Sequence, residues 1–211
     1  MSKTALMKKA LVDALKALVK EKSLAKITVS DITEYCGISR NTFYYHFNDK
    51  YDLINWIFYS ETLPEINAFS EPDRWFDGFV RLCRYMQANR DFYLEALDYA
   101  GQNSLQDYLV DFYFELLKIH INTIYSQSGC KLADEELFLM ARMEAHSYAG
   151  IVMDWVKQGM QDDYMARFEQ LRRVSMLAGS RYSIAPSDEK TAGQEPDVQN
   201  TQNTIQVSHV K

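Results

Sequence analysis

The stretch from Ser39 to Phe47, SRNTFYYHF, places polar side chains directly before and among a group of aromatic rings. An Arg side chain can bridge O6 and N7 of guanine, an Asn side chain can bridge N6 and N7 of adenine, and the methyl group of Thr fits the methyl group of thymine. We therefore predict that Arg40, Asn41 and Thr42 contact base edges in the major groove of a DNA duplex.

Two of the rings that follow have a structural explanation. Phe43 and Phe47 are four residues apart, so a helix places them on one face. We expect them to pack against the preceding helix, through Ile32, Tyr35 and Cys36.

The other three rings, Tyr44, Tyr45 and His46, fall outside that face, and each can reach a phosphate or a base edge. Lys50 and the helix start at Thr28 are further candidates for phosphate contacts. The alternative is that the three polar rings form only a half-exposed helix surface.

These side chains need a helix that presents its first turn outward. Thr28 followed by Asp31 predicts the start of a short helix, because the pair can form a capping box. Gly37 ends that helix where a left-handed backbone is required, and Ser39 then caps a second short helix running to Phe47. Two short helices separated by about three residues are the sequence form of a helix-turn-helix.

The rest of the chain also has helical periodicity, which predicts an all-α fold of about nine helices with no strand. An amphipathic helix is expected from Thr4 to about Lys22, and an apolar, aromatic helix begins at Tyr51 and ends near Pro64. Further helices are expected over Trp75–Gln87, Asp91–Tyr99, Ser104–Ser126, Asp134–Met160 and Tyr164–Tyr182. We divide the chain into a helix-turn-helix domain at 1–50, a helical body at 51–182 and a disordered tail at 183–211, which has no aromatic residue.

Charge is distributed unevenly along the 211 residues. The net charge is −6, but residues 1–50 carry nine Lys or Arg against five Asp or Glu, and the remainder carries a net charge of −10. This asymmetry favours a basic binding module on an acidic body. A solvated, Lys-rich helix is the alternative.

Composition and motifs exclude several classes of protein. No apolar run is long enough to span a membrane, and the N-terminus lacks a signal-peptide core, so we expect a cytoplasmic protein with no membrane partner. Cys36, Cys83 and Cys130 are far apart, and neither they nor His120 and His146 have metal-ligand spacing, so we expect no disulfide framework, metal or cofactor. No catalytic motif is present, which argues against an enzyme.

The segment ITVSDITEYCGISRNTFYYHFNDKYDLI resembles the helix-turn-helix signature of the TetR family of bacterial regulators. The matching residues are Thr28, Asp31-Ile32, Gly37-Ile38-Ser39, Thr42-Phe43-Tyr44, Phe47, Lys50 and Asp52-Leu53. The resemblance implies a homodimer whose N-terminal domains contact successive major grooves of a near-palindromic operator. It also implies that Arg40, Asn41 and Tyr44 approach bases, and that phosphates are held by Thr28, Ser39, Tyr45, His46 and Lys50.

Asn41 departs from the family pattern, because many members have Gly at this position. An additional base-reading side chain there would change the preferred operator. A further similarity is to the subgroup that includes activators of dihydroxyacetone kinase operons. It is carried by the N-terminal helix, by Asn55-Trp56-Ile57-Phe58, and by Gly150, Trp155 and Gly159.

The resemblance implies that residues 51–182 form a ligand-binding and dimerisation domain, in which the last two helices pair across the dimer. Small residues at helical spacing form a stripe that permits close approach of helices: Ala141, Ala145, Ala149, Val152 and Val156. A partner stripe follows at Phe168, Leu171, Ser175, Ala178 and Tyr182. A core stripe within one chain explains the same pattern equally well.

Aromatic residues and histidines of this domain are candidates for a pocket that holds an aromatic or apolar effector. They are Trp75, Phe79, Phe92, Tyr93, Tyr113, His120, His146 and Trp155. Residues of these types are more often part of a core. The predicted function is therefore a sequence-specific DNA-binding regulator, and the alternative is a helical protein-interaction adaptor that retains a helix-turn-helix.

Overall fold

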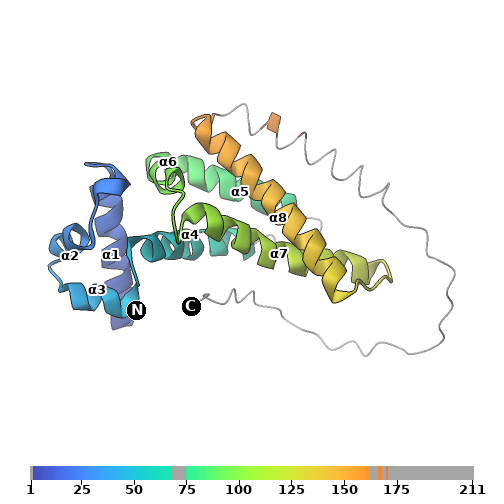
Figure 1. The fold of residues 1–211 in the computed structure, drawn as a ribbon, viewed down its shortest axis with the longest axis horizontal. Helices are drawn as coiled ribbons and strands as arrows, with labels where there is room; N and C mark the ends of the chain where they lie inside the picture. The colour runs from blue at the N-terminus through green and yellow to red at the C-terminus, as the bar shows by residue number, and fades with distance from the viewer. Residues whose placement is uncertain (1, 68–74, 162–165, 168–169, 171–211) are drawn as a thin grey trace. The chain divides into compact units, whose positions relative to one another are not determined.

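The computed structural model describes residues 2–67, 75–161, 166–167 and 170. Within these residues the fold is all-α and contains no strand, as predicted (Figure 1). The helices are α1 (Lys3–Val19), the short 3₁₀ helix η1 (Leu24–Lys26), α2 (Val29–Cys36), α3 (Arg40–His46), α4 (Lys50–Asn67), α5 (Trp75–Ala88), α6 (Arg90–Asp98), α7 (Leu105–Gln127) and α8 (Asp134–Lys157). In the described part of the chain, none of these helices is long and apolar enough to cross a membrane.

The last predicted helix, Tyr164–Tyr182, falls almost entirely outside the described residues, as does the tail predicted at 183–211. The domain boundary after residue 50 and the limits of the tail stay predictions.

The short helices of the N-terminal region begin and end at the predicted residues. The Thr28 hydroxyl accepts a hydrogen bond from the Asp31 amide, and the Asp31 carboxylate accepts one from the Thr28 amide, which completes a capping box. Gly37 ends α2 with φ 65°, in the left-handed region that glycine adopts at little cost. Ser39 caps α3 by accepting from the Thr42 amide at 3.2 Å.

Helix α4 starts immediately after the helix-turn-helix and is longer than predicted. The Asp49 carboxylate accepts hydrogen bonds from the Tyr51 and Asp52 amides and so fixes the first turn. The predicted end near Pro64 is wrong, because α4 continues to Asn67. Pro64 lies close to the helix end, so its missing N–H removes only one hydrogen bond, and the last turn remains helical.

The most extensive packing between two helices joins α7 and α8, which lie side by side in Figure 1. The stripe on α8 faces this contact: Ala141, Ala145, Ala149, Val152 and Val156 are between 0% and 5% exposed within the single chain. These side chains are core residues and cannot also form a surface for a second copy. The dimer assignment of this stripe is therefore wrong, because its small residues permit close packing inside the chain. Leu171 and Ala178, and the rest of the predicted partner stripe, lie outside the described residues.

Candidate DNA-binding site

Helix α3 separates its rings into a buried pair and an exposed group. Phe43 and Phe47 are 0% and 3% exposed, and their ring centroids are 5.9 Å apart. Tyr44 and Tyr45 are 47% and 83% exposed. The buried pair attaches α3 to the rest of the N-terminal region. The polar side chains of α3 therefore lie on the outer surface.

One predicted packing partner is not in this core. Ile32 is fully buried, but Tyr35 is among the exposed aromatic residues and Cys36 is only half-buried. Cys36 Sγ instead donates to the Ala10 carbonyl at 3.4 Å. The expected packing of Tyr35 is wrong, since the last turn of α2 presents this side chain to solvent.

The first turn of α3 carries the predicted base-reading residues. Arg40 and Asn41 are exposed, and Arg40 Nη2 donates to the Tyr44 hydroxyl at 3.3 Å. The Arg40 guanidinium carbon also lies 6.0 Å from the centroid of the Tyr44 ring. Tyr44 therefore restrains the guanidinium on the exposed face of α3, which reduces the entropy lost when it binds a base.

Two of the predicted phosphate contacts already have partners at helix starts. The Ser39 hydroxyl lies 2.9 Å from the Thr42 hydroxyl as well as capping α3. The Thr28 hydroxyl donates a hydrogen bond to the Asp31 carboxylate, which also forms an ion pair with Lys22 Nζ at 2.7 Å. The hydrogen bond from Lys22, followed by those from Thr28, lowers the pKa of Asp31 well below its usual range. This local network fixes the start of α2.

Lys50 has a structural role that sequence reasoning missed. Its ammonium group donates to the carbonyls of Leu24, Ala25 and Ile27 at 2.7, 3.2 and 2.7 Å. These three bonds use all three of its protons, and burial lowers the pKa of Lys50. The predicted phosphate contact does not fit this geometry, because Lys50 ties η1 to the first turn of α4.

A second joint connects α1 to the helices that follow. Lys16 Nζ forms an ion pair with the Glu61 carboxylate at 2.6 Å, and the Tyr85 hydroxyl donates to the same carboxylate at 2.5 Å. Close by along the chain, the Leu24 amide donates to the Glu95 carboxylate at 2.8 Å. These contacts join residues more than 20 positions apart, so no local pattern could have predicted them.

Other lysines of the basic N-terminal region also have internal partners. Lys8 Nζ lies 5.1 Å from the Phe47 ring centroid and 4.8 Å from that of Trp56, and burial lowers the pKa of Lys8. Lys9 pairs with Asp13 along α1. Much of the positive charge counted in residues 1–50 therefore already has a partner within the chain.

Four of the predicted pocket residues come together around Tyr148, which sequence reasoning missed. The rings of Trp75 and His120 are stacked with centroids 5.3 Å apart. Tyr148 contacts Trp75, Phe79 and Tyr113, with centroid distances of 5.7, 4.9 and 5.9 Å. Helices α5, α7 and α8 each supply rings to this aromatic cluster, which consists of Trp75, Phe79, Tyr113, His120 and Tyr148.

Two polar groups of the aromatic cluster are unusual. The Tyr113 hydroxyl is buried and has no hydrogen-bond partner within the described part of the chain. Burial lowers the pKa of His120 to about 4, so its imidazole is neutral at pH 7. The cluster therefore offers neutral hydrogen-bonding groups in apolar surroundings.

The other predicted pocket residues have different surroundings. Phe92 and Tyr93 pack edge to face at 5.1 Å, and Tyr93 also contacts Phe58 of α4. Trp155 is buried and its indole N–H donates to the Gln161 carbonyl at 3.1 Å. His146 lies on the exposed face of α8. Tyr93 and Trp155 are core residues in this structure.

Comparison with known families matches both parts of the chain. Residues 11–57 match the family described as bacterial regulatory proteins of the tetR family. Residues 73–176 match a family described as the C-terminal region of transcriptional regulators. The first match contains α2, α3 and the start of α4, and the second contains α5 to α8.

A relative and two solved structures agree with these matches. The HTH-type dhaKLM operon transcriptional activator DhaS of Lactococcus lactis is 33% identical over 93 residues, which are 44% of this chain and 50% of the relative, so the match spans half of the relative's length. The fold resembles that of a dihydroxyacetone kinase operon activator DhaS, with 24% identity, a TM-score of 0.58 and coverage of 82% and 94% of the two chains. It also resembles FadR from Bacillus subtilis, solved with stearoyl-CoA, with 16% identity, a TM-score of 0.56 and coverage of 79% and 96%.

The matched families and the named relatives are transcriptional regulators, not enzymes, as the absence of catalytic motifs predicts. The similarity to dihydroxyacetone kinase operon activators agrees with the predicted subgroup. On the two family matches, which together account for most of the sequence, the chain belongs to the TetR family of bacterial transcriptional regulators.

Proposed function

We propose that this chain regulates transcription in the cytoplasm by binding a near-palindromic operator as a homodimer, with α3 of each copy in a major groove. The observation that carries the proposal is the division of α3 into a buried pair of Phe rings and an exposed edge of Arg40, Asn41, Tyr44 and Tyr45. Most of this edge faces solvent, and its side chains match the hydrogen-bonding groups of base edges. Contact with an operator is a step shared by activation and repression.

The proposed contacts divide into two groups. Arg40, Asn41, Thr42 and Tyr44 read bases, and the methyl group of Thr42 remains available for thymine because its hydroxyl is bonded to Ser39. The phosphate contacts that we retain from the sequence are Thr28, Ser39, Tyr45 and His46. Tyr45 is the most exposed of the α3 rings, which supports its role.

Duplex binding tests the DNA-binding proposal. Fluorescence anisotropy would compare a labelled duplex from upstream of the chain's own gene with a shuffled duplex of the same composition, from 50 to 300 mM salt. We expect preference for the upstream duplex and a log-linear loss of affinity with salt, because bound phosphates release counterions. Equal affinity for both duplexes, or no binding at low salt, would overturn the proposal and favour an adaptor.

We also propose that the aromatic cluster is where a small aromatic or apolar effector binds. The proposal is supported by the unpartnered Tyr113 hydroxyl, since an unmade buried hydrogen bond costs about 1–3 kcal/mol and a ligand acceptor would remove that cost.

A screen of small aromatic ketones tests the effector proposal, with binding followed by the change in tryptophan fluorescence of the protein. Trp75→Phe should remove the response, while the control Trp56→Phe keeps it. A response that survives Trp75→Phe would place the effector elsewhere.

A further inference from the structure

The aromatic cluster holds a second hydrogen-bond donor without a partner. The indole N–H of Trp75, like the hydroxyl of Tyr113, is buried and makes no hydrogen bond within the described residues. Burial raises the pKa of Tyr148, and the Trp75 N–H opposes that rise without reaching hydrogen-bond geometry. The rings of Trp75 and Tyr113 both contact the Tyr148 ring, so the two donors border one place. A ligand atom that accepts from them would supply the missing hydrogen bonds.

The member of the cluster that could carry a positive charge is neutral. Burial lowers the pKa of His120 to about 4, so its imidazole provides no counter-charge at pH 7. Two basic side chains of α7 and α8 have other neighbours. Arg142 Nη1 pairs with the Asp111 carboxylate at 2.7 Å. Lys118 Nζ lies 6.0 Å from the centroid of the Phe114 ring. An anionic ligand would lose its hydration in the cluster without a cation there to replace it.

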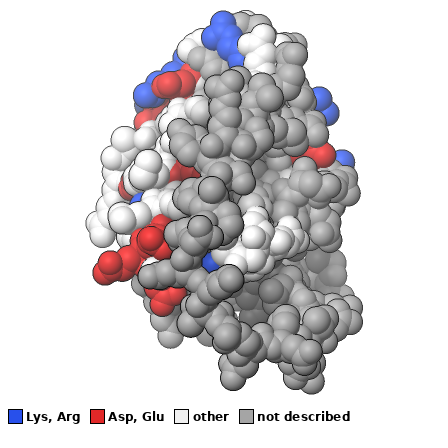
Figure 2. Space-filling model, turned by 90° about the vertical axis from the view of Figure 1, so that its right-hand side faces the viewer, with Lys and Arg blue, Asp and Glu red and all other residues white. Residues whose placement is uncertain are grey.

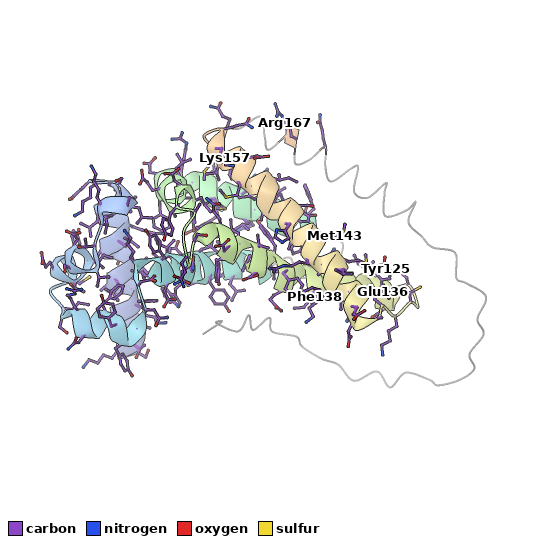
Figure 3. The ribbon with its side chains drawn as sticks, in the orientation of Figure 1. Tyr125, Glu136, Phe138, Met143, Lys157 and Arg167 are labelled. Carbon is purple, nitrogen blue, oxygen red and sulfur yellow. The ribbon has the colours of Figure 1, made fainter. Side chains whose placement is uncertain are left out.

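A negative charge acts on the cluster from α8. Glu144 lies one helical turn before Tyr148, so the two side chains are on the same face of the helix. Burial is the main cause of the raised pKa of Tyr148, and the Glu144 carboxylate adds to it. Figure 3 shows Met143, which directly precedes Glu144, between the two ends of α8. A carboxylate or phosphate group on a bound ligand would be repelled by Glu144.

The start of α8 adds charge of the same sign. Its first turn holds Asp134, Glu135 and Glu136. Figure 2 views the molecule from the end that carries this turn, and acidic side chains gather at one edge of that face. Their combined field disfavours the approach of an anion and leaves an uncharged molecule unaffected.

We propose that the aromatic cluster admits uncharged ligands with a hydrogen-bond acceptor such as a carbonyl oxygen, and that Glu144 excludes carboxylates and phosphates. This inference rests on the effector site of the proposed function and adds the chemical class of the effector and the residue that selects it. A carbonyl oxygen has two lone pairs, so it can accept from both Tyr113 and Trp75. A cationic ligand without an acceptor would leave both donors unpaired. Trp75, His120 and Tyr148 are half-buried, which gives a ligand access from solvent.

Four probes of similar size test the inference on the full chain. Acetophenone is the uncharged ketone, and α-methylstyrene has the same shape with a CH₂ group in place of the carbonyl oxygen. Benzoate is the anion and benzylammonium is the cation. Ligand-observed NMR titration at pH 7 measures the Kd of each probe. Benzoate should bind about tenfold or more weakly than acetophenone, because it loses hydration and meets Glu144.

Tyr113→Phe tests the donor. The Kd of acetophenone divided by that of α-methylstyrene is compared between this variant and the unmodified chain, so that the different hydrophobicity of the two probes cancels. This ratio should rise about fivefold in Tyr113→Phe, because the ketone loses one hydrogen bond. The control Tyr108→Phe removes a hydroxyl from α7 outside the cluster and should leave the ratio unchanged. Circular dichroism verifies that each variant is folded.

Glu144→Gln tests the exclusion of anions. This variant keeps the size of the side chain and should strengthen benzoate binding about threefold or more, with no change for acetophenone. The control Glu135→Gln removes the same charge from the first turn of α8 and should have little effect on either probe.

Several results would overturn the inference. They are a ratio that Tyr113→Phe does not change, benzoate or benzylammonium binding as tightly as acetophenone, and an equal gain for benzoate in Glu144→Gln and Glu135→Gln. If acetophenone still binds saturably in these cases, the effector site of the proposed function stands. Absence of saturable binding by all four probes would reject the effector site and this inference together. Operator binding, measured without a probe, is independent of both outcomes.

Discussion

At the scale of single residues, α3 shows how one short helix serves two purposes. Its two Phe side chains are part of the core, and the residues between and before them are exposed. The helical period places Phe43 and Phe47 together, so their burial was predictable. The exposure of Tyr35 and the hydrogen bonds of Lys50 were not predictable, because the surroundings of these side chains depend on contacts with other elements.

Arg40→Ala should reduce discrimination between a preferred operator and one with a single changed G·C pair by about tenfold, because a bidentate Arg–guanine contact is worth about 1–3 kcal/mol of discrimination. Competition binding with single-base operator variants measures this. The control Lys26→Ala removes an exposed charge outside α3 and should weaken all duplexes alike. If relative affinities across the variants are unchanged in Arg40→Ala, Arg40 does not read a base.

His120 should make stability depend on pH. Its folded-state pKa of about 4 lies below the unfolded value of 6.5, so the unfolded chain binds the proton first as the pH falls. Stability is complete above about pH 6.5 and falls until about pH 4, by on the order of 2 kcal/mol after allowance for the partly exposed ring. Urea unfolding at pH 7.0 and 4.5 tests this. His120→Gln should show a smaller difference between the two pH values, and an equal difference would rule out His120 as the cause.

At the scale of elements, the helix boundaries were predictable and the helix contacts were not. The Thr28, Gly37 and Ser39 signals act within four residues, and each helix end is where they indicate. The extension of α4 through Pro64 was missed because a single Pro weakens a helix without always ending it. For the small-residue stripe of α8, sequence periodicity indicates a packed face but does not identify the element packed against it.

Gly37→Ala should lower the free energy of unfolding by about 1–2 kcal/mol, because an L residue is strained at a φ of 65°. Thermal and urea unfolding measure the loss. Gly37→Asn should lose less, since Asn tolerates the left-handed conformation better than Ala does. Equal losses in the two variants would show that the backbone conformation of this turn is not the cause.

Lys50→Met should lower the free energy of unfolding by about 1–2 kcal/mol, because the carbonyls of Leu24, Ala25 and Ile27 lose their charged hydrogen-bond donor. The exposed control Lys26→Met should change it by less than about 0.5 kcal/mol. The dependence of operator affinity on salt should be the same in Lys50→Met as in the unmodified chain. A slope that falls by about 0.9, with stability unchanged, would return Lys50 to the phosphate contacts.

At the scale of the whole molecule, the sequence predicted the fold class and the family, because the helix-turn-helix signature is contiguous. The assembly of distant residues into the aromatic cluster was predictable only in part. The ring-rich segments indicated candidates, but Tyr148 was not among them, and Tyr93 packs with Phe58 and Phe92 instead. Such groupings depend on how α4 to α8 pack, which local periodicity does not determine.

The proposed homodimer should require a fixed separation of the two operator half-sites. Successive major grooves on one side of B-DNA are about 34 Å or 10 base pairs apart, so inserting five base pairs between half-sites rotates one of them to the opposite side. Affinity should then fall to that of a single half-site, at least tenfold weaker. Gel-shift titration measures this, and inserting ten pairs is the matched control for duplex length. Insensitivity to a five-pair insertion would argue against a rigid dimer on two grooves.

The joint between Lys16 and Glu61 has a consequence for the construction of chimaeric regulators. A fusion that exchanges α1 to α3 for those of another family member with no cation at the position of Lys16 would leave the Glu61 carboxylate without its ion pair. This partly buried carboxylate would keep the hydrogen bond from the Tyr85 hydroxyl but lose its counter-charge, and the graft would be destabilised even if its operator contacts were intact. A transplanted DNA-binding domain therefore needs a cation at the position of Lys16, or Glu61 must be replaced together with it.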